Sequence, residues 1–329
     1  MRPRRPQIAS GGLRRSADVG QPRRMPLPPD LVSLAGRQRG VFTTSQAAGF
    51  AVSPPALVRL VRTGRLLHPS RGLYLMADQA AEAPDERHRQ LCAGALLLYP
   101  DAALDGLSAV LAHDLPVWSV DLGRPEIARP IHRSAGAVGF RVRPSFGATS
   151  VETPLGPAIP APTAVVRMSL DHGVIQGVVS ADAALHRGLA TPDSLAEVVA
   201  RVATWPHASR ARTMLSLVDG RSESVGESIL RVEAALRGIR LVPQFEVHDR
   251  WGRLVGRADF VVEGTRVLVE FDGKVKYAAG DPEVLWAEKR REDGLREAGY
   301  LVVRVTWADL ARPDRIMTRI RRAMLAASA

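Results

Sequence analysis

The sequence has a single cysteine, Cys92, in a chain of 329 residues. One cysteine excludes internal disulfide bonds and any cysteine-rich metal cluster. Cys92 lies within the apolar run of residues 91–97, so we expect it to be a core residue. No apolar run approaches the roughly 18 residues that a membrane-spanning helix requires, and the N-terminus lacks the apolar segment of a signal peptide. We therefore expect a cytoplasmic protein without a membrane partner.

Lysine is also scarce, and arginine supplies nearly all of the basic charge. The formal net charge is +11 and the sequence pI is about 10.9. An excess of this size indicates a polyanionic partner, and the lack of an apolar span favours nucleic acid over a membrane surface. Arginine suits bidentate contacts with phosphate, although a GC-rich genome would give the same preference for arginine.

Residues 1–27 contain little apolar surface and are rich in arginine, proline, glycine and serine. This composition is typical of a disordered basic arm, which could follow the phosphates of DNA. A start codon assigned too early explains it equally well, because Met25 can serve as an alternative start. The sequence leaves both explanations open.

The pattern of residues 28–78 predicts three short helices and a β-hairpin. The helices are expected over residues 31–39, 45–49 and 54–63, with Ser53 capping the third and Gly64 ending it. Two short apolar runs on either side of residues 69–72, Pro-Ser-Arg-Gly, predict the hairpin. Three helices and a hairpin in this order make a winged helix-turn-helix.

The middle region, residues 79–215, shows no site signature. We expect short strands in the proline- and glycine-rich stretch 115–162 and helices over residues 84–99, 102–112, 163–171, 174–187 and 192–204. The region is therefore predicted to be α/β.

The last region, residues 216–329, alternates regularly between helical and strand patterns. The expected elements are a helix over 224–237, strands over 241–248, 254–262 and 267–272, a helix over 282–298, a strand over 300–306 and a helix over 313–327. The order is α-β-β-β-α-β-α. The whole chain is therefore predicted to be an α+β multidomain protein.

Three acidic residues in this last region lie on predicted strands. Asp259 lies in the second strand, and Glu270 and Asp272 lie at the end of the third. Side chains two apart in a strand share a face, and pairing of the two strands can bring Asp259 beside Glu270. Carboxylates in an otherwise apolar strand are costly to bury unless a cation or hydrogen-bond donors compensate. Clustered carboxylates are the ligands that Mg²⁺ prefers, and a bound ion would polarise a scissile phosphate and activate a water.

The order of elements, with an acid on the first helix, Asp259 on one strand and Glu-x-Asp-Gly on the next, resembles the very-short-patch-repair-like endonucleases of the PD-(D/E)xK superfamily. Residues 289–295, followed by residues 299–305, are similar to that group's closing helix and strand. The resemblance covers residues 224–329. It implies a restriction-endonuclease-like αβββαβ fold and Mg²⁺ (or Mn²⁺), with Asp259 and Glu270 as metal ligands and Glu227 as the helix-borne acid.

The sequence departs from the superfamily pattern at one position. Asp272 stands two residues after Glu270, where the superfamily has the lysine that supports the attacking water. Lys274, Lys289 or Arg291 could replace that lysine, or the domain could bind DNA without cutting it.

Each residue of the carboxylate pattern also has a structural explanation. Glu227 fits a capping box with Ser224, and Asp272-Gly273 fits a turn that ends a strand. The basic residues 289–291 fit a solvated helix face.

A second resemblance covers roughly residues 30–190. The stretch 40–49, then residues 57–64 and then Gly72-Leu73-Tyr74 resemble the winged-helix domain of AbiEi-like antitoxins, the antitoxin halves of type IV toxin–antitoxin systems. That family is implied to bind its own promoter and to have a cognate toxin. The basic residues that would meet phosphates or guanine edges are Arg59, Arg62, Arg65 and Arg71.

The winged helix could instead serve protein contacts, with Arg71 a simple turn residue. Two hypotheses follow for the whole chain. In the first, the winged helix delivers a Mg²⁺-dependent DNA endonuclease, as in phage or mobile-element defence. In the second, the protein is an AbiEi-like antitoxin or transcriptional regulator whose nuclease-like fold is catalytically degenerate.

Overall fold

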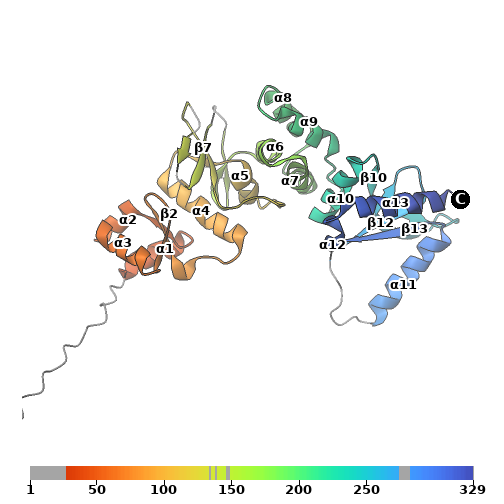
Figure 1. Ribbon diagram of the computed structural model, residues 1–329, viewed down its shortest axis with the longest axis horizontal. Helices are drawn as coiled ribbons and strands as arrows, with labels where there is room; N and C mark the ends of the chain where they lie inside the picture. The colour runs from red at the N-terminus through yellow and green to blue at the C-terminus, as the bar shows by residue number, and fades with distance from the viewer. Residues whose placement is uncertain (1–26, 133–134, 138, 146–148, 274–281, 329) are drawn as a thin grey trace, which may run out of the picture.

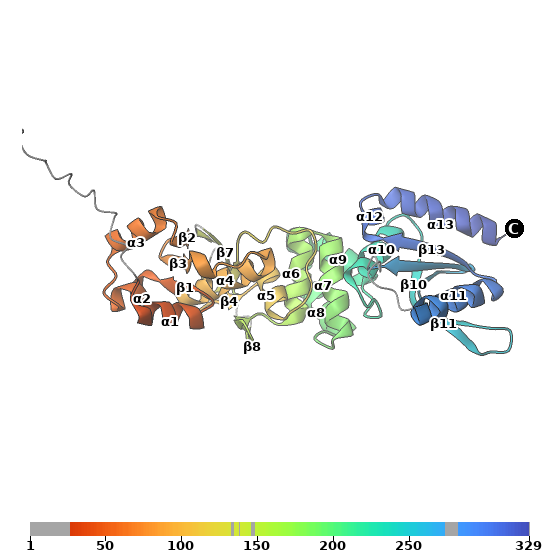
Figure 2. The ribbon, with the colours of Figure 1, turned by 90° about the horizontal axis from the view of Figure 1, so that it is seen from below.

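The computed structural model describes residues 27–328 apart from 133–134, 138, 146–148 and 274–281, and it describes the backbone alone for 135–137 and 282–289. The described chain forms three successive regions along one long axis, with the N-terminal helices at one end and the C-terminal helix at the other (Figures 1 and 2). The predicted basic arm lies outside the described residues except for Leu27, which packs in the first core.

The N-terminal region is a small helical unit closed by a three-stranded antiparallel sheet with the order β1-β3-β2. The predicted three helices and hairpin are confirmed, and β1 is an addition, because three residues are too few to show a strand pattern. The elements are α1 (Pro29–Arg37), β1 (Val41–Thr43), α2 (Thr44–Gly49), α3 (Pro54–Arg62), β2 (Leu66–Ser70) and β3 (Leu73–Met76).

Two different signals start the second and third helices. Thr43 and Gln46 form a capping box at α2, in which the amide of Gln46 donates to Thr43 Oγ1 at 3.2 Å and the amide of Thr43 donates to Gln46 Oε1 at 2.9 Å. The prediction that the Ser53 side chain caps α3 is wrong. Ser53 occupies the N-cap position, but its side chain makes no capping hydrogen bond. Pro54 starts the helix instead, because its fixed φ suits the first turn.

The middle region combines a six-stranded sheet, ordered β6-β7-β5-β4-β9-β8, with a bundle of helices. Its elements are α4 (Pro84–Leu98), β4 (Ala103–Leu104), α5 (Gly106–Ala112), β5 (Glu126–Arg129), β6 (Ala135–Ala137), β7 (Phe140–Pro144), β8 (Val151–Thr153), β9 (Gly156–Ala158), α6 (Ala161–His172), α7 (Val174–His186), α8 (Pro192–Arg201) and α9 (Ala208–Leu217), preceded by a short 3₁₀ helix at Ala77–Gln79. The helix α9 was not predicted.

The predicted helix over residues 102–112 is wrong at its start. Leu104 belongs to the sheet, where it pairs with Ile127 and Ala158. Asp105 is the N-cap of α5, and its side chain accepts a hydrogen bond from the amide of Gly106 at 2.7 Å. Gly106 has φ +45°, a conformation that favours glycine, so the helix begins only there.

The winged-helix and middle regions share a core. Leu73 and Leu75 of β3 belong to the same cluster of buried residues as Cys92 and Ala95 of α4. Gly94 of α4 allows Leu73 to approach closely. Burial raises the pKa of the Cys92 thiol to about 12, which agrees with the expected core position.

The C-terminal region is a four-stranded sheet, ordered β10-β11-β12-β13, with helices on both faces. The first three strands are antiparallel, and β12 and β13 are parallel. The predicted element order is confirmed, with the additional short helix α12. The bounds are α10 (Val225–Ala235), β10 (Leu241–His248), β11 (Leu254–Val262), β12 (Val267–Asp272), α11 (Pro282–Glu297), β13 (Leu301–Thr306), α12 (Trp307–Leu310) and α13 (Pro313–Ala327).

The helix α10 joins the middle region to the C-terminal sheet. Its Val232 packs in the middle core, whereas Leu230 packs in the C-terminal core. Asp182 of α7 accepts hydrogen bonds from Ser228 Oγ at 2.7 Å and from Arg231 Nη2 at 2.6 Å. Asp182 and Arg231 are both buried, so loss of either partner would leave an uncompensated charge between α7 and α10. Among the described residues, no helix is long and apolar enough to cross a membrane.

Candidate nucleic-acid interface and carboxylate cluster

The third helix, α3, has one buried face and one exposed face. Ala56, Leu57 and Leu60 are buried in the core of the N-terminal region. Arg59 and Arg62 are exposed on the opposite face, as their spacing of three predicts. An amphipathic helix of this kind, which follows α2 and carries arginines on its exposed face, has the form of a recognition helix for the major groove of DNA.

The exposed face of α3 also carries Val58, which is 61% exposed. A small apolar side chain beside two arginines suits contact with a thymine methyl group. The other two predicted DNA-binding residues flank the hairpin. Arg65 precedes β2, and Arg71 lies in the turn between β2 and β3; both are exposed. A middle-region turn lies against this hairpin turn, where Gly139 comes close to the carbonyl of Pro69.

In the C-terminal region, Glu227 is a buried carboxylate at the start of α10. Its Oε1 accepts a hydrogen bond from Ser224 Oγ at 2.7 Å, and its Oε2 accepts one from the amide of Glu223 at 3.0 Å. The amide of Glu227 donates in return to Ser224 Oγ at 3.2 Å. Ser224 therefore caps α10, but the full capping box that the sequence offered as an alternative is not formed, because Glu227 accepts from the amide of Glu223 rather than from that of Ser224.

Asp259 of β11 lies one position beyond the last pair that joins β11 to β12, Phe260 and Val269. Its Oδ2 accepts a hydrogen bond from the amide of Phe271 at 2.7 Å. Burial raises the pKa of the Asp259 carboxyl, and the negative charges of Glu227 and Glu223 raise it further, against the lowering effects of the Phe271 amide and Arg291. Asp259 thus lies within electrostatic range of Glu227 on α10.

Glu270 of β12 occupies the matching position on the neighbouring strand, and it is held by arginines. Arg291 Nη2 of α11 donates to Glu270 Oε1 at 2.6 Å. Arg304 Nε of β13 lies 3.8 Å from Glu270 Oε2. Arg291 also lowers the pKa of Asp259 electrostatically. This arginine therefore interacts with both predicted metal ligands, Asp259 and Glu270.

The remaining predicted catalytic residues have different outcomes. Asp272 is exposed at the end of β12 and pairs in register with Thr306. Lys274 lies outside the described residues. Lys289 lies on α11, but its side chain is outside the described part of the chain.

Sequence reasoning missed three further residues that border the cluster of Glu227, Asp259 and Glu270, and these are Glu223, Gln244 and Arg257. Gln244 Nε2 lies 3.3 Å from Glu227 Oε2, and its φ of +55° interrupts the pairing of β10 opposite Asp259. Arg257 Nη2 lies 3.1 Å from Glu223 Oε1. A signal existed only for Arg257, which is two residues before Asp259 on the same strand. No feature of the sequence indicates the positive φ of Gln244.

The described residues contain no group of three or more histidine, cysteine or acidic side chains placed to hold a metal ion. The donor set of Asp259, Glu270 and Glu227 has the oxygen chemistry that Mg²⁺ prefers. Arg291, however, already compensates the charge of Glu270. An ion shared by Asp259 and Glu270 would have to displace that arginine.

An aromatic contact links the carboxylate cluster to the middle region. The rings of Trp118, from the loop after α5, and Trp307 of α12 have centroids 5.4 Å apart. Trp307 meets Phe271 edge-on at 5.2 Å, and Phe271 also packs against Gly226. The Phe271 amide donates to Asp259. The rings of Trp118, Trp307 and Phe271 therefore connect the middle region to the carboxylate cluster.

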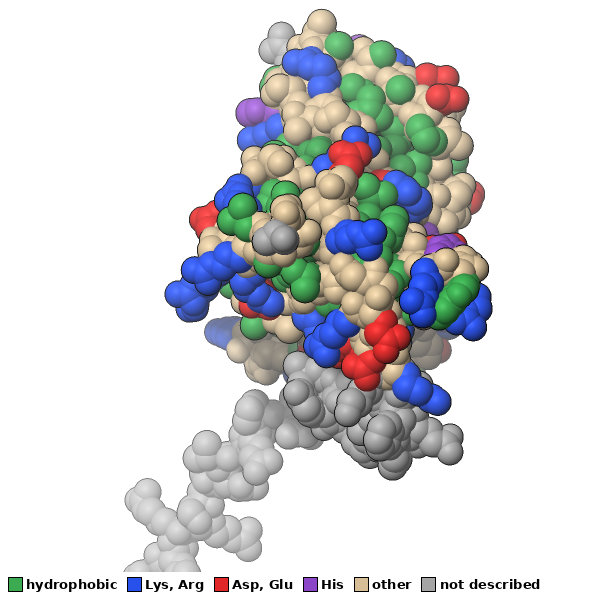
Figure 3. All heavy atoms as spheres, turned by 90° about the vertical axis from the view of Figure 1, so that its right-hand side faces the viewer, with side chains coloured by type: hydrophobic (Ala, Val, Ile, Leu, Met, Phe, Trp, Pro, Cys, Tyr) green, Lys and Arg blue, Asp and Glu red, His purple; other side chains and the backbone are tan. Residues whose placement is uncertain are grey.

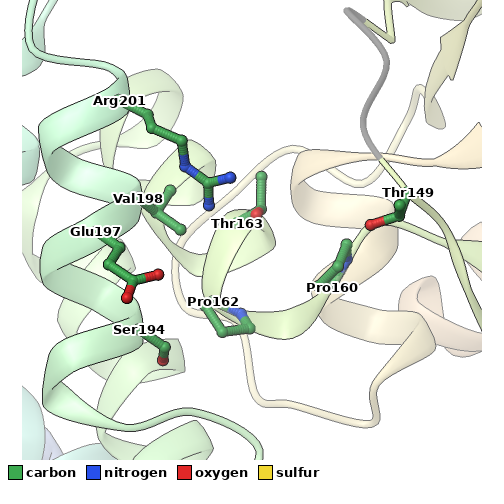
Figure 4. A pocket seen from close by; sticks show the side chains of 8 residues that line it. All are labelled: Thr149, Pro160, Pro162, Thr163, Ser194, Glu197, Val198 and Arg201. Carbon is green, nitrogen blue, oxygen red and sulfur yellow. The ribbon is translucent and has the colours of Figure 1, made fainter.

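A pocket of about 370 Å³ lies in the middle region, between the start of α6 and α8. Figure 4 shows Glu197 and Arg201 of α8 facing the proline-rich start of α6 across it. Its lining residues are Thr149, Pro160, Pro162, Thr163, Ser194, Glu197, Val198 and Arg201. None of them belongs to the predicted sites.

Comparison with known proteins identifies the N-terminal region. Residues 29–77 match the family described as "Transcriptional regulator, AbiEi antitoxin". These residues form an AbiEi antitoxin domain. The match spans the elements from α1 to the end of β3, and therefore includes the exposed face of α3. The match supports DNA-binding regulation as the role of this part of the chain.

Two uncharacterised proteins, Rv2248 and MT2308 from two strains of Mycobacterium tuberculosis, are similar over most of the chain. Each is 27% identical over 273 residues, which cover 80% of this chain and 93% of the relative. The crystal structure of the RV2827C protein from Mycobacterium tuberculosis aligns with 67% of this chain and 85% of its own, at 19% identity and a TM-score of 0.35.

Proposed function

We propose that this protein is a sequence-specific DNA-binding regulator of the AbiEi antitoxin type. In this proposal α3 enters the major groove, and Arg59 and Arg62 contact guanine edges or phosphates there. The observation that carries the proposal is that both arginines are exposed on α3, within the part of the chain that matches the AbiEi family. The high net charge of +11 supports a polyanionic partner.

The test is binding to the DNA upstream of the protein's own coding sequence, measured by fluorescence anisotropy at several salt concentrations. In the double variant Arg59→Gln/Arg62→Gln, each lost base contact should weaken specific binding by about 1–3 kcal/mol, or roughly 5- to 150-fold. Each lost phosphate contact should instead reduce the salt slope by about 1.

The matched control is Arg201→Gln/Arg212→Gln, which removes the same charge from exposed positions on α8 and α9. If the control weakens binding as much as the α3 variant, nonspecific charge accounts for the affinity and α3 is not the recognition helix. Because the matched family is described as an antitoxin, we also propose a cognate toxin as a protein partner. Co-purification with the product of an adjacent gene tests that partner.

A second candidate function is phosphodiester hydrolysis in the C-terminal region. The observation that favours it is the raised pKa of Asp259, caused by burial and by the carboxylates of Glu227 and Glu223. Acidic charge that is concentrated without full compensation is typical of functional sites. Asp259 and Glu270 would hold Mg²⁺ or Mn²⁺, which would supply polarisation of the phosphate and an activated water. In the same region Glu227 would complete or orient this site from α10.

Two observations weigh against hydrolysis as the main function. Glu270 is paired with Arg291, and Asp272 stands where a lysine is expected. Incubation of supercoiled plasmid with Mg²⁺, Mn²⁺ or EDTA, beside an Asp259→Ala/Glu270→Ala variant, separates the candidates. Metal-dependent nicking that the variant lacks would establish a nuclease. Binding without nicking by either protein would leave the regulator alone.

A further inference from the structure

The turn between β10 and β11 presents a tryptophan between two arginines. Trp251 is 64% exposed. The guanidinium carbons of Arg250 and Arg253 lie 4.1 and 4.8 Å from the centroid of its ring. A single exposed apolar residue is ordinary on a protein surface. An indole that two cations hold at a hairpin tip is a more specific arrangement, and no core packing accounts for it.

The turn is held in one conformation by Asp249. Its Oδ1 accepts hydrogen bonds from the amides of Trp251 at 2.8 Å and Arg253 at 2.9 Å. Its Oδ2 accepts one from Arg253 Nε at 2.8 Å. A preorganised turn loses little conformational entropy when it binds a partner. The turn therefore holds the exposed Trp251 in a position from which it can bind.

The hairpin also projects from the rest of the C-terminal region. Figure 2 shows β10 and β11 extending past α11, away from the middle region. Arg257, farther along β11, is exposed, and its carbonyl accepts a hydrogen bond from Arg291 at 3.2 Å. Figure 3 shows the C-terminal end of the molecule, where basic side chains are spread over the visible surface and acidic ones are fewer.

We propose that residues 249–253 form a second DNA contact, separate from α3, in which the indole of Trp251 stacks on a nucleobase. Arg250 and Arg253, which lie over the ring in the free protein, move off it to contact the phosphates on either side. Charge supports this partner, because the turn contains two arginines and one aspartate and so has a net charge of +1. Every nucleobase has a π face, so stacking of this kind tolerates any sequence. The base is either unpaired or unstacked from its neighbours, because a paired and stacked base hides its face.

The experiment measures binding of the full chain to a fluorescein-labelled single strand of about 20 nucleotides and to the same sequence as a duplex. Trp251→Ala should weaken binding by about 1–3 kcal/mol per stacked base, or roughly 5- to 150-fold. Trp251→Phe should retain most of the affinity. Arg250→Gln/Arg253→Gln should lower the single-strand salt slope by about 1.4, which is 0.7 for each phosphate contact.

The matched control is Leu254→Ala, which removes another exposed apolar side chain from the same hairpin. A loss in Trp251→Ala on the single strand places the turn on unpaired DNA, and a loss on the duplex alone places it at an unstacked step; either result supports the proposal. Equal affinity of Trp251→Ala and the native chain for both probes overturns it, even if the arginine variant binds weakly. The α3 variants report separately on specific duplex binding, so the two proposals fail independently.

Discussion

Glu126 of the middle region and Asp259 of the C-terminal region are both acids in a sheet, but the pKa values of their carboxyls shift in opposite directions. Glu126 is the more deeply buried, at 3% exposure. Burial alone would raise its pKa, yet His172, Arg143 and Arg141 outweigh burial and lower it. Asp259 is less buried, and its pKa is raised.

Charge balance explains the difference between the two groups. In the middle region, Arg141 Nη1 lies 2.8 Å from Glu126 Oε1, and Arg167 pairs with the buried Asp105. Around Asp259, the nearest charges include two further acids, and Arg291 is bound to Glu270. Several cations around one buried carboxylate, as at Glu126, suit a structural network, whereas incomplete compensation, as at Asp259, is typical of functional sites. The contrast predicts that substitutions will destabilise one group and stabilise the other.

The largest effect should come from Arg167→Met in the middle network. Arg167 is 4% exposed, and its removal leaves Asp105 buried without its main partner. Breaking a buried pair in this way costs about 3–5 kcal/mol. We expect the midpoint of urea unfolding to fall accordingly, with Arg201→Met on the exposed face of α8 as the control.

A second substitution sharpens this test. Asp105→Leu in the Arg167→Met background removes the uncompensated charge and should restore part of the lost stability. Recovery will be incomplete, because Asp105 also caps α5 through the amide of Gly106. If the double variant is no more stable than Arg167→Met alone, the unpaired charge is not the cause of the loss.

A smaller effect of opposite sign should follow from Asp259→Asn. The neutral amide keeps an oxygen for the Phe271 amide and removes the charge that burial and the neighbouring acids oppose. Relief of such strain at functional sites commonly gives about 0.5–2 kcal/mol, so the melting temperature at pH 7–8 should rise by a few degrees.

The pH dependence of this gain follows from the direction of the shift. Because the folded-state pKa of Asp259 is above the unfolded value, its contribution to stability is present at low pH and is lost as pH rises through the folded pKa. The advantage of Asp259→Asn should therefore be complete above the folded pKa and vanish as pH falls toward the unfolded value of 3.8. Thermal melts of both proteins from pH 3.5 to 8 measure it. A gain that is constant across this range would contradict the assigned cause.

Much of the fold followed from local patterns in the sequence. The strands Leu241–His248, Leu254–Val262 and Val267–Asp272 have the predicted bounds, because alternation and turn residues mark both ends of each. The start of α5 did not follow, since Leu104 is apolar in a helix-like pattern and only its long-range pairing with Ile127 places it in a strand. Short sheets assembled from distant segments leave little local signal.

The sequence named the acids of the candidate site, and it named Arg291 as a candidate beside them, but it did not show that Arg291 pairs with Glu270. Glu227, Asp259 and Glu270 stand out because carboxylates interrupt apolar patterns. The pairing of Arg291 with Glu270 depends on how α11 crosses the sheet, which no spacing encodes. The middle network was missed for the same reason, since Asp105 and Arg167 are 62 residues apart in the sequence.

The smallest effect on stability should come from Glu223→Gln. This substitution tests whether an ion pair at the border of the Asp259 cluster contributes to stability. Glu223 and Arg257 are both largely exposed, and such surface pairs contribute roughly 0–1 kcal/mol, so the melting temperature should hardly change. Removal of the Glu223 charge should nevertheless lower the pKa of Asp259, since that charge helps to raise it. The stability gained by Asp259→Asn should then be smaller in the Glu223→Gln background. A large loss of stability from Glu223→Gln alone would mean that ion pairs hold this cluster together as they hold the middle network, and the two groups would no longer differ in kind.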